Sequence, residues 1–141
     1  MAEAMDDVHA VPTRARRDRW LMVAAVVAIV FGVATIRAGG RVLFGMPDAV
    51  AAAGNYVPFV LWFNFLAGFL YVVAGVGFWL HRRWSFLLAA AIAVATVVVF
   101  VAFVIYMAAG GAWEARTMGA MTLRSVAWIV LALVAARRIA R

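Results

Sequence analysis

The stretch WSFLLAAAIAVATVVVFVAFVIYMA, from Trp84 to Ala108, contains no charged residue and few polar ones. A helix needs about 20 mostly apolar residues to cross a hydrocarbon core of about 30 Å. Inside lipid, backbone N–H and C=O groups can be paired only within a helix or a closed barrel. This stretch therefore predicts a helix that spans a membrane.

Three other stretches have the same apolar character. They cover residues 20–36, 57–80 and 118–136, and Arg-rich or Gly-rich breaks separate them. Hydrophobic residues make up 69% of the 141-residue chain, whereas soluble domains contain about 45–50%. A soluble chain of this size cannot hide so much apolar surface from water. The sequence predicts an all-α membrane protein, a single domain over residues 20–141 folded as an antiparallel bundle of four transmembrane helices.

Residues 1–19 precede the first apolar stretch and contain few large apolar side chains. Such a composition cannot bury enough surface to become ordered, which predicts a flexible cytoplasmic tail. A secretory signal peptide is the alternative for the first 36 residues. However, the apolar run over residues 20–36 is longer than the usual core of about 7–15 residues in such peptides. We therefore expect a retained signal-anchor helix.

The loop between the first two apolar stretches carries helix boundary signals. We expect Gly39 and Gly40 to end the first helix. Pro47 and Asp48 then precede an Ala-rich run that Gly54 closes. Proline at the first helical position, an acid near the start and glycine after the end are typical of a short helix. We expect this helix to lie on the outer membrane surface, and an irregular loop is the alternative.

The arginines are distributed unevenly between the two sides of the predicted bundle. One side has nine of them: Arg14, Arg16, Arg17, Arg19, Arg82, Arg83, Arg137, Arg138 and Arg141. The other side has four: Arg37, Arg41, Arg116 and Arg124. By the positive-inside rule, we expect both termini to lie in the cytoplasm, and we expect a multi-pass protein of the cell inner membrane. Membrane topology therefore explains the net charge of +7 better than nucleic-acid binding does.

Small residues recur at spacings that place them on one helix face. Ala24, Ala28 and Gly32 are four residues apart in the first stretch, and Gly68 and Gly75 are seven apart in the second. Small residues let neighbouring backbones approach closely in membranes, which predicts helix–helix contacts at both faces. The alternative for the first stretch is that alanine is simply abundant there.

Five polar residues are expected near the outer end of the bundle: Asn64, Glu114, Arg116, Arg124 and Arg37. We refer to them as the outer polar set. In one interpretation they form a pocket for an anionic headgroup, a quinone or another amphipathic ligand. In the other, Glu114 forms an ion pair with Arg124 or Arg116 and clamps the third loop to the fourth helix. We favour the clamp, because charges near a membrane edge commonly pair for structural reasons.

Groups that usually carry chemistry are scarce in this sequence. There is no cysteine, and no Asp, Glu, Lys or His falls in the middle third of a predicted helix. Proton-coupled transporters usually need such groups. His81 lies at the predicted cytoplasmic edge without a second histidine nearby, which disfavours bis-His haem. The sequence predicts no cofactor, no metal site and no enzymatic activity.

Two blocks carry a resemblance to known proteins: GNYVPFVLWFNF at residues 54–65, and the pair EART at 114–117 with MTLR at 121–124. They resemble segments of small, uncharacterised bacterial four-helix membrane proteins over about residues 30–136. The resemblance implies a four-helix fold and draws attention to the outer polar set. It implies no activity, cofactor or catalytic residue.

Our first expectation for function is a non-enzymatic structural or accessory subunit of a larger membrane assembly. The alternative is a small carrier or binder for a hydrophobic or anionic ligand that uses the outer polar set. An enzyme is the least supported class, because a lone Glu among arginines is a poor catalytic set. The expected partners are the lipid bilayer and other membrane subunits or further copies of this chain, and not nucleic acid.

Overall fold

The computed structural model describes residues 18–139, and this part of the chain forms five helices. Four are long: α1 (Arg19–Leu43), α3 (Pro58–Trp79), α4 (Arg83–Ala108) and α5 (Ala115–Ile139). The short helix α2 is Pro47–Ala53. Each long helix is apolar and long enough to cross a membrane. The predicted tail lies outside the described residues except for Asp18 and Arg19.

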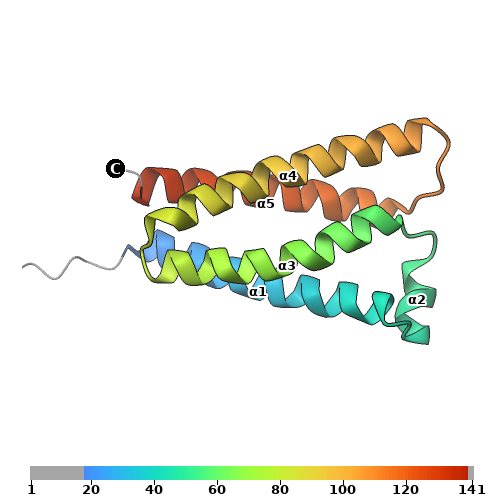
Figure 1. The fold of residues 1–141 in the computed structure, drawn as a ribbon, viewed down its shortest axis with the longest axis horizontal. Helices are drawn as coiled ribbons and strands as arrows, with labels where there is room; N and C mark the ends of the chain where they lie inside the picture. The colour runs from blue at the N-terminus through green and yellow to red at the C-terminus, as the bar shows by residue number, and fades with distance from the viewer. Residues whose placement is uncertain (1–17, 140–141) are drawn as a thin grey trace, which may run out of the picture.

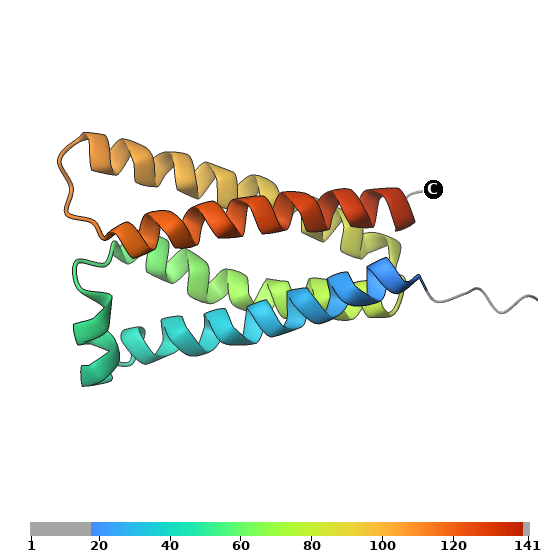
Figure 2. The same ribbon diagram turned by 180° about the vertical axis from the view of Figure 1, so that it is seen from behind.

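The four long helices lie side by side, and successive ones run in opposite directions (Figures 1 and 2). α1 packs most extensively on α3, and α4 packs mainly on α5. The short helix α2 lies beside the end of α1 at one end of the bundle, which we call the α2 end, and the loop that joins α4 to α5 lies at the same end (Figure 1). At the opposite end, Arg138 pairs with Asp18 at 3.3 Å, so the end of α5 is tied to the start of α1.

The contact between α1 and α3 depends on glycine. A Cβ added to Gly32 would lie 2.7 Å from the carbonyl oxygen of Gly68, and one added to Gly68 would lie 3.1 Å from the carbonyl oxygen of Gly32. Gly75 is equally enclosed and buried, and Ala24 and Ala28 belong to the main buried core. All five residues of the predicted packing faces are therefore buried, and the glycines let two helix backbones touch.

The expected end of the first helix at Gly39 and Gly40 is wrong, because α1 continues through both glycines to Leu43. A Cβ on Gly39 would lie 3.2 Å from the Cβ of Phe65, and one on Gly40 would lie 3.4 Å from the ring of Phe65. These glycines therefore make room for an aromatic side chain of α3. Glycine is tolerated inside this helix because close packing offsets its low helix propensity.

Three long helices end in the same way. The residue after the cap has a left-handed conformation in each: Gly45 after α1 (φ 73°), His81 after α3 (φ 52°) and Gly110 after α4 (φ 87°). The next amide donates to the carbonyl five residues earlier, with N···O distances of 3.0, 2.9 and 3.1 Å. This Schellman pattern satisfies carbonyl groups that the helix itself leaves unpaired.

The predicted short helix in the first outside loop is present as α2. It has Pro47 in its first turn, Asp48 as the acid near its start, and Gly54 with φ 60° directly after its end. Asp48 also forms an ion pair with Arg41, which fixes α2 against the end of α1. Its placement on a membrane surface stays a prediction.

The outside of the bundle is apolar along the helices. Leu87, Val94, Ile105 and Leu123 are each more than 60% exposed. Their side chains would face water in a soluble protein, which is unfavourable for so many large apolar groups. In a bilayer they would face acyl chains, as the length and composition of the helices predict.

Candidate functional site

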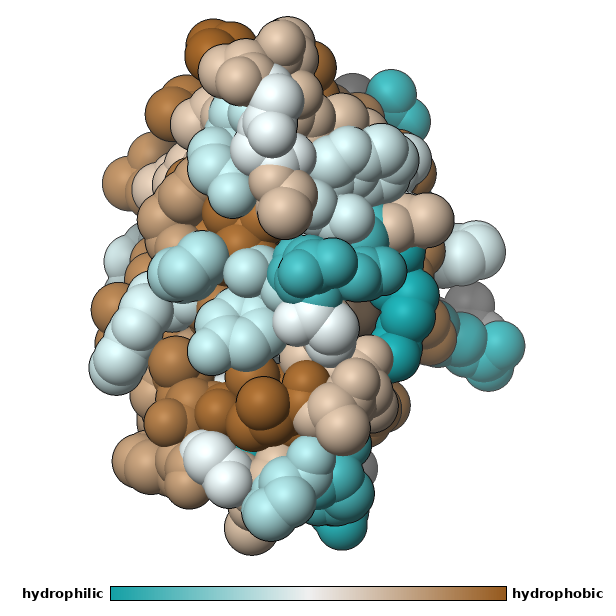
Figure 3. All heavy atoms as spheres, turned by 90° about the vertical axis from the view of Figure 1, so that its right-hand side faces the viewer, coloured by the Kyte–Doolittle hydropathy of each residue, from teal (hydrophilic) through white to brown (hydrophobic). Residues whose placement is uncertain are grey.

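A cavity of about 220 Å³ lies at the α2 end. Its walls come from α1, α3 and α5, and the segment after α2 also contributes. Figure 3 views this end and shows hydrophilic side chains across its centre between apolar ones. The polar side chains that line the cavity are Thr35, Tyr56, Asn64, Arg116, Thr117 and Arg124. Two are cations and none is an acid.

Arg124 is the deepest charge of the cavity lining. α5 begins at Ala115, three residues earlier than predicted, so Arg124 lies about 13 Å along the helix from its first residue. Its guanidinium carbon lies 5.7 Å from the centre of the Phe31 ring, a cation–π distance. Its Nε is fully buried and has no hydrogen-bond partner. Arg124 therefore lines the cavity, and part of its guanidinium group is buried between the helices.

No carboxylate within residues 18–139 forms an ion pair with Arg124. The three acids in this range are engaged elsewhere: Asp18 with Arg138, Asp48 with Arg41, and Glu114 with the backbone N–H of Asn55. The predicted Glu114–Arg124 pair is therefore not formed. The described part of the chain leaves the positive charge at the cavity floor without a protein anion.

Glu114 and Arg116 instead connect the start of α5 with α2 and the segment that follows α2. Glu114 accepts a hydrogen bond from the Asn55 N–H at 3.0 Å, and Arg116 donates to the carbonyl oxygen of Ala52 at 3.0 Å. These two residues tie the start of α5 and the residue before it to the region of α2, whereas the sequence predicted a clamp between the third loop and the fourth helix. We call these two contacts the loop clamp.

Asn64 faces the same cavity from α3. Its amide nitrogen donates to the sulfur of Met121 at 3.7 Å, which is a weak hydrogen bond. Its Oδ1 atom is buried and has no partner. Asn64 thus places an unused polar atom near Arg124, and the fold brings together three members of the outer polar set: Asn64, Arg116 and Arg124.

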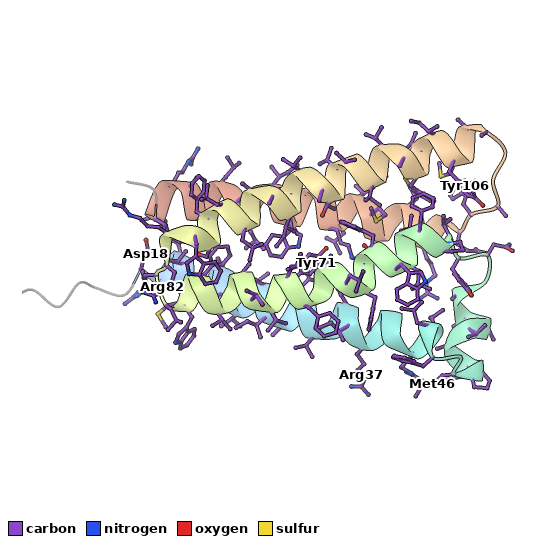
Figure 4. All side chains as sticks on the ribbon, viewed as in Figure 1. Asp18, Arg37, Met46, Tyr71, Arg82 and Tyr106 are labelled. Atoms are coloured by element: carbon purple, nitrogen blue, oxygen red, sulfur yellow. The ribbon has the colours of Figure 1, made fainter. Side chains whose placement is uncertain are left out.

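Arg37 does not join them. Its side chain is exposed and points away from the bundle (Figure 4). It lies on the face of α1 that is turned away from the other helices, and it does not line the cavity that contains Arg124. The rotation of α1 about its axis turns Thr35 and Gly39 toward the cavity, so Arg37 between them faces outward.

Below the cavity, an aromatic layer that the sequence analysis did not identify fills the bundle. Tyr71 stacks on Phe31 with ring centres 5.8 Å apart and packs against Trp128 at 4.6 Å. Figure 4 shows Tyr71 between the helices. The Tyr71 hydroxyl and the Trp128 Nε1 are buried, and the Tyr71 hydroxyl interacts with the side chains of Thr96, Trp128 and Arg124. Two spacings in the sequence could have predicted this layer. Tyr71 follows Asn64 by seven residues and so shares its face of α3, and Trp128 follows Arg124 by four residues and so shares its face of α5.

The chemistry of this arrangement is that of binding. Two guanidinium groups and the amide of Asn64 offer hydrogen bonds and positive charge to an anionic oxygen. Within residues 18–139, no group of three His, Cys, Asp or Glu side chains lies close enough together to hold a metal ion. The loop clamp occupies Glu114, the acid nearest to the cavity, in a structural contact.

Comparisons with protein-family models, with curated proteins and with solved structures find no match to this chain, and they assign it to no family.

Proposed function

We propose that this chain is a non-enzymatic integral membrane protein that binds the anionic group of a ligand in the cavity at the α2 end. The observation that carries this proposal is Arg124, a cation at the cavity floor without a carboxylate partner in residues 18–139. A charged arginine near the centre of a membrane helix costs about 2.5–3.5 kcal/mol on insertion scales. A bound anion would offset that cost.

Arg116 and Asn64 support the same proposal. Arg116 lies about two helical turns, or about 12 Å, before Arg124 on α5 and also lines the cavity. Asn64 adds a side-chain amide from α3, whose Nδ2 has a second N–H to donate besides the one directed at Met121. An anionic group between the two arginines would receive charge-assisted hydrogen bonds, which are about twice as strong as neutral ones.

The proposed location is the inner membrane of a bacterium, with both termini in the cytoplasm and the cavity facing outward. Support comes from the excess of arginine on the side of the termini. In this orientation the cavity opens toward the outer leaflet and the space beyond it.

A structural or accessory subunit of a larger membrane assembly is the second candidate. The loop clamp favours it, because the contacts of Glu114 with Asn55 and of Arg116 with Ala52 hold the α2 end together without any ligand. In that case an anionic group of a partner subunit or of a lipid would neutralise the positive charge of Arg124.

Native mass spectrometry in a neutral detergent tests both candidates. The wild-type protein should retain dodecyl phosphate and should not retain the cation dodecyltrimethylammonium. Arg124→Gln should weaken retention of dodecyl phosphate about tenfold, which corresponds to about 1.4 kcal/mol. Arg83→Gln, which removes an exposed arginine at the opposite end, is the matched control and should leave retention unchanged. Equal retention by the two variants would refute the binding proposal, and a co-purifying membrane protein would favour the second candidate.

A further inference from the structure

The serine and threonine side chains of residues 18–139 fall into two groups. Four of them donate a hydrogen bond to a backbone carbonyl three or four residues earlier in the chain. These four are Ser85 at 2.6 Å, Thr96 at 2.7 Å, Thr122 at 2.9 Å and Ser125 at 2.8 Å. Such a bond satisfies the hydroxyl group within its own segment. None of these four residues lines the cavity.

The other two are Thr35 of α1 and Thr117 of α5, and both line the cavity. Neither hydroxyl forms a hydrogen bond with another group of residues 18–139. Thr35 lies in the interior of α1 and is only 4% exposed, and the carbonyl of Phe31 precedes it by the usual four residues. The described part of the chain therefore leaves serine and threonine hydroxyls unpaired only at the cavity.

Three helices bring hydrogen-bond donors toward the floor of the cavity. On α1, Thr35 lies one turn beyond Phe31 on the same face, and the guanidinium carbon of Arg124 lies 5.7 Å from the centre of the Phe31 ring. On α3, Asn64 donates to the sulfur of Met121, which precedes Arg124 by three residues on α5. The amide nitrogen of Asn64 keeps a second N–H for another acceptor. Donors from α1, α3 and α5 thus line one cavity from three sides.

The number and the arrangement of these donors favour an anion with three terminal oxygens. A carboxylate has two oxygens in one plane, and a single guanidinium can satisfy both of them. A phosphate-type group has three terminal oxygens that point in different directions. We infer that the anionic group of the ligand is a tetrahedral oxyanion of the phosphate or sulfonate type, which Thr35, Asn64 and Arg124 hold together from three helices.

This inference rests on the proposed function and adds the class of the anionic group. Thr35 sets the preference for three oxygens over two, because Arg124 and Asn64 can also serve a carboxylate. The cavity of about 220 Å³ has room for such a group, since a single water needs only about 10–15 Å³. Thr117 adds a hydroxyl nearer to the α2 end, on the same face of α5 as Arg124.

Binding of charge-matched probes to the full-length protein in nanodiscs of zwitterionic lipid tests this inference. At alkaline pH, dodecanesulfonate and laurate each carry one negative charge on a chain of the same length, and only the sulfonate has three oxygens. Wild-type protein should bind dodecanesulfonate about tenfold more tightly than laurate. Thr35→Val removes the hydroxyl and should abolish this preference by weakening only dodecanesulfonate. Thr122→Val removes a hydroxyl that is already bonded to the Met118 carbonyl, so this matched control should change neither affinity.

The outcomes distinguish this inference from the proposed function. If both probes bind equally well, or Thr35→Val leaves the preference unchanged, the inference is overturned although an anion still binds the cavity. If Thr35→Val weakens both probes and lowers the melting temperature without ligand, Thr35 has a structural role and the inference is also overturned. If no probe binds the wild-type protein, the proposed function and the inference both fail.

Methanesulfonate, which has the same head without the chain, identifies the source of the anion. Binding as tight as that of dodecanesulfonate would indicate a water-soluble anion, and much weaker binding would indicate the head of a membrane lipid. Either result supports the tetrahedral oxyanion, provided that Thr35→Val weakens the probe that binds and Thr122→Val does not.

Discussion

Arg124 and Glu114 belong to separate interactions at the α2 end. Glu114 accepts a hydrogen bond from the backbone of Asn55, and Arg124 lies over the ring of Phe31 at the cavity floor. Opposite charges that lie near each other in a sequence suggest an ion pair. A carboxylate can instead accept a hydrogen bond from a backbone N–H, as Glu114 does. In this protein the backbone contact stabilises the loops and leaves the arginine available to a ligand.

The double replacement of Glu114 and Arg124 should therefore be additive. Glu114→Gln keeps an oxygen that can accept from the Asn55 N–H, so it should cost less than about 1 kcal/mol. Arg124→Leu removes the charge together with its need for a partner and should be neutral or stabilising without ligand. Unfolding in detergent measures all three variants, and the double variant should match the sum within about 0.5 kcal/mol. A coupling well above that value would mean that the two side chains interact.

His81 has an unfavourable backbone conformation. Among the non-glycine residues of 18–139, it alone has a positive φ, at 52°. A left-handed conformation costs an L-residue about 1–2 kcal/mol more than it costs glycine. His81→Gly should therefore raise stability by up to about 1 kcal/mol, measured as a higher melting temperature. Gly110 holds the equivalent position after α4 and has open space around it, so Gly110→Ala should lower stability. If both changes shift the melting temperature in the same direction, backbone strain is not the cause.

At the scale of elements, close packing decides where helices continue and where they cross. α1 runs through Gly39 and Gly40 because Phe65 of α3 fills the space beside them. α1 and α3 approach closely at Gly32, Gly68 and Gly75. In a membrane, where lipid is as apolar as a leucine side chain, such packing is a main source of helix association.

A pair of glycine replacements tests this packing. A Cβ on Gly75 would lie 2.9 Å from the carbonyl oxygen of Ala25, whereas one on Gly119 would meet no atom within 4 Å. Gly75→Ala should therefore lower the free energy of unfolding by about 1–3 kcal/mol, the typical cost of overpacking. Gly119→Ala should be neutral or stabilising by up to about 1 kcal/mol, because alanine favours a helix more than glycine does. Thermal unfolding in one detergent compares the two, and equal effects would mean that α1 and α3 do not meet as closely as described.

At the scale of the whole molecule, both ends of the described chain lie at one end of the bundle (Figure 1). The residues that line the cavity place it at the other end. In the proposed orientation, which the arginine asymmetry supports, the first of these ends faces the cytoplasm. The cavity would then be accessible from outside the cell and from the outer leaflet.

The chain has no cysteine, so single cysteines can report on this orientation. Ala51→Cys on α2 should react with a membrane-impermeant thiol reagent added to intact cells with a permeable outer membrane. Leu80→Cys, between α3 and α4, should react only after the inner membrane is opened. Both positions are exposed, so accessibility to the reagent depends on the side of the membrane. The reverse labelling pattern would place the termini outside.

The sequence by itself determined the number, order and type of the long helices. Their predicted ranges differ from the structure mainly at the end of α1 and at both ends of α5. This success has a physical basis, because the length and hydropathy of a spanning helix are local properties that the bilayer imposes on each segment. α2 was also predictable, since Pro47 and Gly54 act on their own backbone.

Only the tertiary structure decided which polar residues meet. It gathered Asn64, Arg116 and Arg124 around one cavity, turned Arg37 to the other side of α1, and gave Glu114 a backbone partner. These outcomes depend on how each helix is rotated about its axis and on how closely α1 approaches α3 and α5. Rotation and crossing distance are set by contacts between residues far apart in sequence, and hydropathy along a single segment does not encode them.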